Sequence, residues 1–226
     1  MKLATALAVS SCSAPAKTAP DDNAVSSAYE RQDVLTLTAL ANQGNAEAQF
    51  KLGFMYNAGK GVPNDDDAAI IWYRKAADQG YAQAQFYLGS MYRFGTGVVE
   101  DNAAAINWYK KAAEQGNSKA QEQLGWMYSK GTGVVQDYSA AASWYRKAAE
   151  QGNSQAQNYL GWMYADGTGV AQDYVQAHMW FNLSAAGATE ANLRDGATIN
   201  RDRLAAKMTP AQIAEAQKLA SAFKVK

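Results

Sequence analysis

A 36-residue period runs through the middle of the chain and is the strongest constraint on its fold. Tryptophan recurs in this register, each 36 residues after the one before, at Trp72, Trp108, Trp144 and Trp180. Leucine, glycine, tyrosine and aspartate keep the same step at other positions of each copy. Self-similarity of this length is typical of stacked units of supersecondary structure.

Each copy is predicted to contain two amphipathic helices. In the second copy, apolar residues recur at helical spacing between residues 82 and 94 and again between 102 and 115. Neither helix can bury its apolar stripe alone, so the copies must stack. We expect the four tryptophans to form core between the helices. A glycine inside each first helix costs about 1 kcal/mol against alanine, so we expect the paired helix to approach closely at Gly53, Gly89, Gly125 and Gly161.

The segment "GTGVVED" at residues 95–101 joins the two predicted helices. A phosphate-binding loop would need a strand before it and Gly-Lys-Ser/Thr within it. An acidic metal-binding loop would need several alternating oxygen ligands. The residues favour a plain turn, because Gly95 can end the first helix in the left-handed conformation and Gly97 can turn the backbone again. Asp101 and Asn117 are expected to cap the two helices that follow them.

The copy "AQAQFYLGSMYRFGTGVVEDNAAAINWYKKAAEQG" resembles the Sel1-like repeat, a relative of the tetratricopeptide repeat. The features that match are Leu88-Gly89, Gly95-Thr96-Gly97-Val98 and Trp108-Tyr109, and the other copies match at the same places. The resemblance implies an all-α fold, a right-handed α-α superhelical solenoid of four 36-residue helix-turn-helix repeats with capping helices at both ends. It also implies a role as an adaptor or scaffold for other proteins rather than an enzyme.

The repeats are predicted at residues 45–80, 81–116, 117–152 and 153–188. Residues 25–44 are expected to form an N-terminal cap of one or two helical turns, after a polar linker at 21–27. Residues 189–226 are expected to form two capping helices, since a solenoid needs its ends covered. Thr209, Pro210 and Gln212 make a strong start for the last of them.

Residues 1–24 differ in kind from the rest and are interpreted as a leader and linker. Lys2 precedes a short apolar run, and the only cysteine of the chain, Cys12, follows it. This resembles a bacterial lipoprotein signal, in which the cysteine is acylated. Ala14-Pro15-Ala16 offers an ordinary cleavage site instead. We expect the protein in the bacterial cell envelope, in the periplasm or lipid-anchored, with a cytoplasmic protein as the alternative. No segment is apolar enough to predict a transmembrane helix.

Charge and composition argue against several functional classes. The chain has 21 Lys and Arg against 21 Asp and Glu, which argues against nucleic-acid binding. No cofactor or metal site is predicted, because zinc would need several Cys or His ligands and the chain has one histidine, His178. We expect this histidine to be packed or partly exposed, without a catalytic role. No catalytic residue is assigned, and a hydrolytic enzyme is kept as a minor alternative.

The candidate binding residues lie where the copies differ on the first helices. These positions are rich in aromatic residues, and related helical-hairpin solenoids line their concave face with first helices. An aromatic groove suits peptide recognition. The candidates are Phe50, Phe54, Phe86, Tyr87, Phe94, Trp126, Tyr159 and Trp162. Phe54, Trp126 and Trp162 have core packing between repeats as an equal alternative, whereas Tyr87, Phe94 and Tyr159 are expected at the surface.

The leading hypothesis is therefore an interaction module that binds a partner protein or peptide through its concave face. A structural or regulatory envelope lipoprotein, which tethers an assembly without a peptide groove, is the second hypothesis.

Overall fold

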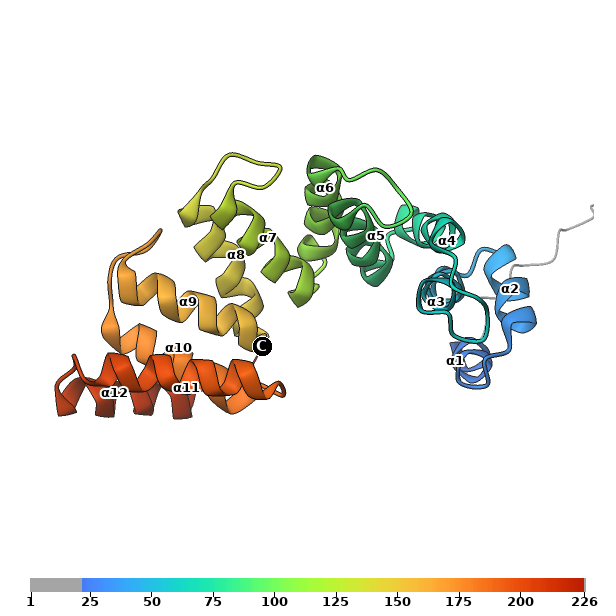
Figure 1. Ribbon diagram of the computed structural model, residues 1–226. Helices are drawn as coiled ribbons and strands as arrows, with labels where there is room; N and C mark the ends of the chain where they lie inside the picture. Colours follow the sequence, from blue (N-terminus) through green and yellow to red (C-terminus); the bar gives the residue numbers. More distant parts are fainter. Residues whose placement is uncertain (1–21, 226) are drawn as a thin grey trace, which may run out of the picture.

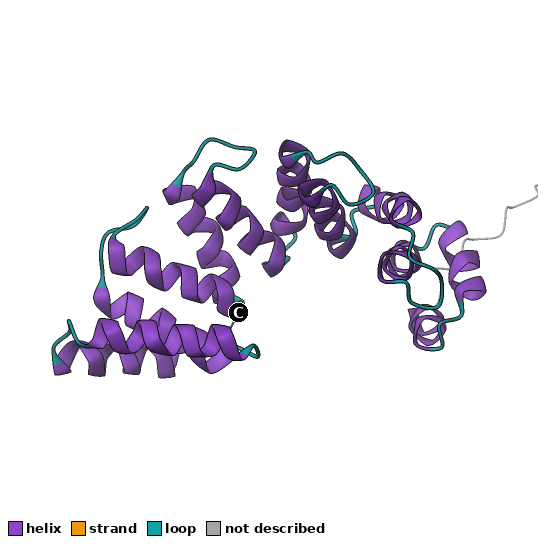
Figure 2. Ribbon diagram, viewed as in Figure 1, coloured by secondary structure: helices purple, strands orange, loops and turns teal. Residues whose placement is uncertain are grey.

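The computed structural model describes residues 22–225, and every regular element within that range is a helix (Figures 1 and 2). The first two helices are α1 (Asp22–Glu30) and α2 (Val34–Asn42). The repeats follow as α3 (Ala46–Ala58) and α4 (Asp66–Asp78), α5 (Ala82–Phe94) and α6 (Asn102–Glu114), α7 (Ser118–Lys130) and α8 (Tyr138–Glu150), and α9 (Ser154–Asp166) and α10 (Tyr174–Gly187). The last two helices are α11 (Ala191–Ala205) and α12 (Pro210–Ala222).

The helices follow one another along an arch (Figure 1). The first helix of each repeat packs on the second helix of the same repeat, and that second helix packs on the first helix of the next one. Each repeat therefore shares its core with its neighbours, as a stack of amphipathic hairpins requires. The predicted all-α solenoid is confirmed.

Within each repeat the two helices meet at a glycine and an aromatic ring. A Cβ atom added to Gly53, Gly125 or Gly161 would lie 2.9, 2.6 or 2.7 Å from the ring of Tyr73, Tyr145 or Phe181 respectively. These distances are shorter than real Cβ contacts allow, so only glycine fits there. The predicted close approach is confirmed, and the aromatic ring of the second helix occupies the space.

The expected burial of the tryptophans is correct only for Trp180, which is 5% exposed. Trp72, Trp108 and Trp144 are half-buried, and each lies under the ammonium group of a lysine three residues later, with Nζ 4.0–4.1 Å from the ring centroid. The fully buried aromatic residue of each of these helices is the next one along, Tyr73, Tyr109 or Tyr145. Trp180 is covered because Phe223, just after α12, packs edge-on against it with ring centroids 5.4 Å apart.

The turns have the predicted geometry. Gly95 ends α5 with φ at 66°, and Gly97 has φ at 65°. The Asp101 carboxylate accepts a hydrogen bond from the backbone N–H of Ala104 at 2.9 Å, and Asn117 caps α7 in the same way. Gly97 also packs against the preceding repeat, since a Cβ there would lie 2.7 Å from the Asp66 carbonyl oxygen. Each turn thus joins two helices and braces two repeats.

A ladder of glutamine side chains runs through the repeat boundaries. In Gln49, Gln85 and Gln121, the buried side-chain amide donates to a backbone carbonyl of the preceding hairpin at 2.9–3.1 Å. Its oxygen then accepts from the glutamine that caps the C-terminus of the hairpin's own second helix, Gln79, Gln115 or Gln151, at 2.7–2.8 Å. In the last repeat Gly187 stands where that glutamine would be, and Gln157 keeps a buried Oε1 without a hydrogen-bond partner.

Two helices cap each end of the array, and only the C-terminal pair matches the prediction. At the N-terminal end, the predicted linker at 21–27 and the cap of one or two turns are wrong for the described residues, because α1 and α2 are nine residues each and bury Val25, Ala28 and Leu37. At the C-terminal end, α11 and α12 both pack on α10, and the predicted capping box of Thr209 and Gln212 is present. None of the described helices is long and apolar enough to cross a membrane.

Candidate functional site on the first helices

Seven of the eight candidate binding residues fall into two groups along the first helices, and Phe94 lies apart from both. Phe50 and Phe54 of α3 and Phe86 and Tyr87 of α5 form the N-terminal group. Their rings pack on one another, with Tyr87 5.5 Å from Phe50, 5.9 Å from Phe54 and 5.5 Å from Phe86 between centroids. Tyr87 also stacks on the buried Tyr73 at 5.4 Å. All four are half-buried, so this group acts chiefly as packing between the first two repeats.

Tyr87 and Tyr159 are less exposed than expected. Tyr159 is half-buried and stacks on Tyr145 with centroids 4.9 Å apart. Both tyrosines cover the ring that fills the space beside a repeat glycine, so part of each side chain belongs to the core. Phe94 is at the surface as expected, 66% exposed at the end of α5.

The second group lines an open hollow of about 540 Å³ between α7 and α9. Trp126 of α7 and Tyr159 and Trp162 of α9 line it, together with Tyr138 and Tyr145 of α8. Trp162 is 43% exposed and packs edge-on against Phe181 at 5.7 Å. The hollow therefore has five aromatic walls, two of which, Trp162 and Tyr138, are open to solvent over about 43% and 42% of their surface.

The hollow is rigidly built. The Arg93 guanidinium of α5 lies 4.0 Å from the Trp126 ring centroid and donates to the Gln123 side chain, which ties α5 to α7 beside the hollow. The Ser129 hydroxyl donates to the Trp126 carbonyl at 2.8 Å. Burial raises the pKa of the Tyr145 hydroxyl, so this wall stays neutral. Walls fixed in this way bind a partner with little loss of side-chain entropy.

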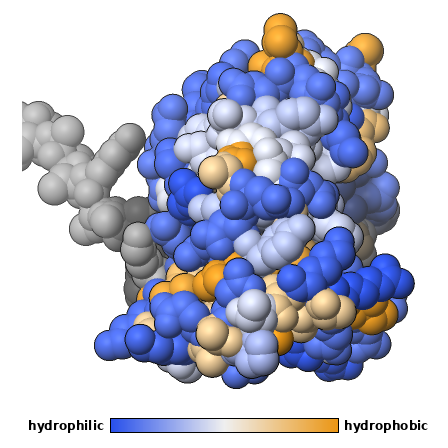
Figure 3. All heavy atoms as spheres, turned by 90° about the vertical axis from the view of Figure 1, so that its left-hand side faces the viewer, coloured by the Kyte–Doolittle hydropathy of each residue, from blue (hydrophilic) through white to orange (hydrophobic). Residues whose placement is uncertain are grey.

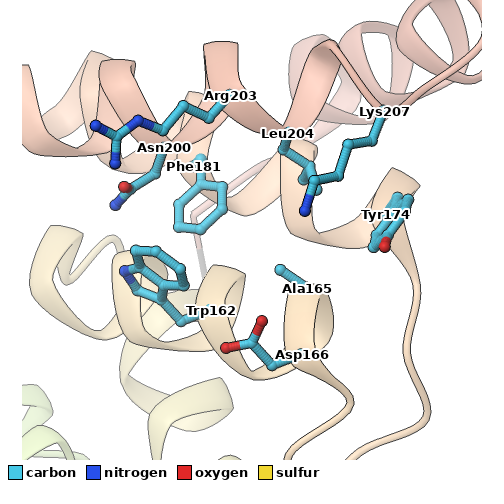
Figure 4. Close-up of a pocket in the computed structure, with 9 residues that line it drawn as sticks. All are labelled: Trp162, Ala165, Asp166, Tyr174, Phe181, Asn200, Arg203, Leu204 and Lys207. Carbon is cyan, nitrogen blue, oxygen red and sulfur yellow. The ribbon is translucent and has the colours of Figure 1, made fainter.

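A smaller hollow of about 190 Å³ adjoins the first and shares Trp162 and Asp166 with it. Its floor is apolar, with Phe181 and Leu204, and its far wall is α11. Figure 4 shows Lys207 extending from the turn after α11 towards Asp166, while Arg203 of α11 lies on the side of Trp162. Seen from this end, the molecule is largely hydrophilic with a band of apolar side chains low on the surface (Figure 3). This end of the molecule thus leaves apolar surface open to solvent.

The family model for the Sel1 repeat matches residues 46–81, 82–117, 118–153 and 154–188. The chain belongs to the Sel1 repeat family. The Sel1 repeats comprise α3 to α10, which are most of the described helices. Residues of the last two repeats line the larger hollow, and residues of the last repeat form part of the lining of the smaller one.

Solved structures give the same assignment. The chain is similar to a protective antigen present in uropathogenic Escherichia coli strains, with 38% identity and a TM-score of 0.76 over 85% of this chain and 40% of that one. It is also similar to a Sel1 repeat protein from Oxalobacter formigenes, with 39% identity and a TM-score of 0.67 over 74% of this chain and 49% of that one. The chain thus spans less than half the length of these two Sel1 proteins.

An immunity protein from Pseudomonas aeruginosa shares the fold alone, with 22% identity and a TM-score of 0.53 over 90% of this chain and 81% of that one. Comparison with curated proteins gave no match.

Within residues 22–225 of this Sel1 array, no group of three or more His, Cys, Asp or Glu residues is placed to hold a metal ion. His178 is 3% exposed on α10, and its Nδ1 has no hydrogen-bond partner. Burial, and after it the positive charge of Arg201, lowers the pKa of this imidazole. The prediction of a packed histidine is confirmed.

The residues at the end of α11 that line the smaller hollow were not predicted from the sequence. Asn200, Arg203, Leu204 and Lys207 lie outside the repeats, so a comparison between copies cannot find them. The spacing of Asn200, Arg203 and Leu204 over one helical turn was the available signal, because residues three and four apart share a helix face.

Proposed function

We propose that this Sel1 repeat protein is a non-enzymatic interaction module that binds a segment of a partner protein in the aromatic hollow between α7 and α9. The observation that supports this most is Trp162, which keeps 43% of its surface exposed at the centre of a concave site with four other aromatic walls. Exposed aromatic residues in concave sites are frequent binding hot spots. The size of the hollow suits one or two side chains rather than a folded domain.

The choice of residues for a test follows from their burial. Tyr87 and Tyr159 are poor choices, because both support buried tyrosines. Trp162→Ala is preferable, since its side chain is the most exposed of the five walls, and Trp126→Ala is the second variant. Asp78→Lys on α4 and Glu114→Lys on α6 are the controls, because both side chains are exposed on second helices.

The experiment is affinity capture from the native cell envelope with the full chain as bait, followed by binding measurements with the captured partner. Trp162→Ala should weaken binding at least tenfold, or about 1.4 kcal/mol. Because Trp162 packs edge-on against the buried Phe181, the melting temperature should also fall, and binding is measured at a temperature at which circular dichroism shows the variant folded. Both control variants should bind as the parent does. Loss of binding through the control variants alone would reject the hollow and favour the tethering alternative.

The proposed location is the bacterial cell envelope, with Cys12 as the acylated residue. Cys12 and the rest of the predicted leader up to residue 21 lie outside the described residues, and the proposal rests on the sequence pattern. Labelling with radioactive palmitate should mark the parent chain and leave Cys12→Ser unlabelled. A mature N-terminus near Lys17 would indicate cleavage without acylation, and recovery of the intact Met1 form from the cytosol would reject export.

A further inference from the structure

The two adjoining hollows carry an excess of positive charge in a chain that has none overall. The whole chain balances 21 basic against 21 acidic residues. The lining of the hollows contains three basic residues, Lys130, Arg203 and Lys207, and one acidic residue, Asp166. Clustering of one sign of charge in a concave site focuses the field there and favours ligands of the opposite sign.

The two basic residues at the end of α11, Arg203 in its last turn and Lys207 just beyond it, differ from the other basic residues of the helix. Arg194 pairs with Asp195 at 3.6 Å, and Arg201 pairs with Asp202 at 2.8 Å. Arg203 and Lys207 form no ion pair with any residue between 22 and 225. Both line the smaller hollow. A bound carboxylate would pair with these two charges.

The positive charges stand beside apolar surface rather than in open solvent. The smaller hollow has Phe181 and Leu204 as its floor and Trp162 as the wall it shares with the aromatic hollow (Figure 4). A ligand that fills both hollows must therefore present an apolar side chain to Trp162 and a negative group to Arg203 and Lys207. Neighbouring residues of an extended peptide can do both at once.

We infer that the partner segment bound in the hollows is acidic, an extended peptide with an apolar side chain against Trp162 and an Asp or Glu carboxylate against Arg203 and Lys207. This inference rests on the proposed function and adds the chemistry of the partner to it. Charge-assisted hydrogen bonds from a guanidinium and an ammonium group would hold the carboxylate. Asp166, which borders both hollows, lowers the affinity for such a peptide, because its carboxylate repels the carboxylate of the peptide.

The test is the selection of binders from a random library of short peptides displayed on phage, with the full chain immobilised. Enriched peptides are synthesised, and their affinity is measured by fluorescence anisotropy for the parent and for charge variants. We expect enrichment of Asp or Glu next to an apolar residue, and weaker binding as the salt concentration rises. Arg203→Gln and Lys207→Gln should each weaken binding about threefold, and roughly tenfold together.

A variant that removes a negative charge should change the affinity in the opposite direction from those that remove a positive charge. Asp166→Asn should strengthen binding of the same peptides about two- to threefold, since it removes a like charge. Arg194→Gln is the matched control, because it removes a guanidinium from the same helix outside the hollows, and it should leave affinity unchanged.

The outcomes separate the inference from the proposed function. Peptides without acidic residues that still lose affinity in Trp162→Ala would overturn the inference and leave the aromatic hollow as the binding site. Acidic peptides that are insensitive to Arg203→Gln and Lys207→Gln would also overturn it. If no peptide is enriched, or if none depends on Trp162, the proposed function fails and the inference fails with it.

Discussion

The ring of Tyr109 fills the space in which a Cβ atom of Gly89 would lie, with Cδ1 only 2.8 Å from that position. The same relation holds in all four repeats. The two helices of each hairpin can therefore lie this close together only because the residue of the first helix is glycine.

Gly89→Ala is therefore expected to destabilise the protein, although alanine is the better helix former. The gain in helix propensity is about 1 kcal/mol, whereas overpacking a filled core costs about 1–3 kcal/mol or more. Gly196→Ala is the control, since Gly196 lies in α11 with nothing within 4 Å of the added Cβ. Urea unfolding should show a lower midpoint for the first variant and a higher one for the second. A higher midpoint for both would mean that the helices can separate at no cost.

The two neighbouring aromatic residues of α6 are expected to differ in their contribution to stability. Tyr109 is fully buried, and its hydroxyl lies 3.0 Å from that of Ser90. Tyr109→Ala should cost about 3–5 kcal/mol, the range for a buried aromatic residue. Trp108 is half-buried under Lys111, and Trp108→Ala should cost about half as much. Equilibrium unfolding followed by circular dichroism would measure both, and an equal or reversed order would contradict the register described here.

Gly187→Gln is expected to be more stable than Gly187→Ala, because it completes the glutamine ladder, while both variants share a Cβ that would lie 3.0 Å from the Ser154 hydroxyl oxygen. The new side chain can donate to the buried Oε1 of Gln157, and a net gain of about 0.5–1.5 kcal/mol is usual for such a hydrogen bond. Gly187→Ala is the control, because it removes the glycine as Gly187→Gln does but cannot form the hydrogen bond. The two variants should differ in melting temperature in the parent background. They should no longer differ when Gln157 is replaced by Leu, and a persistent difference would exclude the hydrogen bond as its cause.

The stability of the protein is expected to fall as the pH falls below about 6.5, the ordinary pKa of histidine. Burial lowers the pKa of His178 in the folded state, so in this window the unfolded chain binds a proton that the folded chain does not. The loss should level off below the folded-state pKa. Arg201 and Asp202 face this group. Melting curves between about pH 7 and pH 5 should show the decline for the parent chain, and His178→Ala should remove that part of it.

The sequence was sufficient for those features that depend on one residue type within one copy. Gly95, Gly97 and Asp101 have backbone and capping roles that glycine and aspartate perform almost alone, so their geometry was predictable. The choice between Trp108 and Tyr109 as the buried ring was not. Adjacent residues lie about 100° apart around a helix, and the orientation of the stripe depends on where the next repeat packs.

The binding face was only partly predictable for a related reason. Differences between copies located Trp126 and Trp162 on the walls of the hollow, but the same differences also marked Phe50 and Tyr87, which vary because they fit one another. The N-terminal cap was predicted but its helical extent was underestimated, although Ala41, Gln43 and Gly44 keep the 36-residue register with Ala77, Gln79 and Gly80. The upstream part of α2 breaks that register, and the signal becomes too weak to see.

The glutamine ladder makes the length of the array adjustable in evolution. Because each rung from Gln49 to Gln121 offers the same donor and acceptor to its neighbours, unequal crossing-over between two copies would add or remove 36 residues and recreate an existing junction. The copy that ends in Gly187 is the exception. If it were duplicated internally, it would place a second buried amide oxygen without a hydrogen-bond partner in the array, so growth upstream of it is favoured.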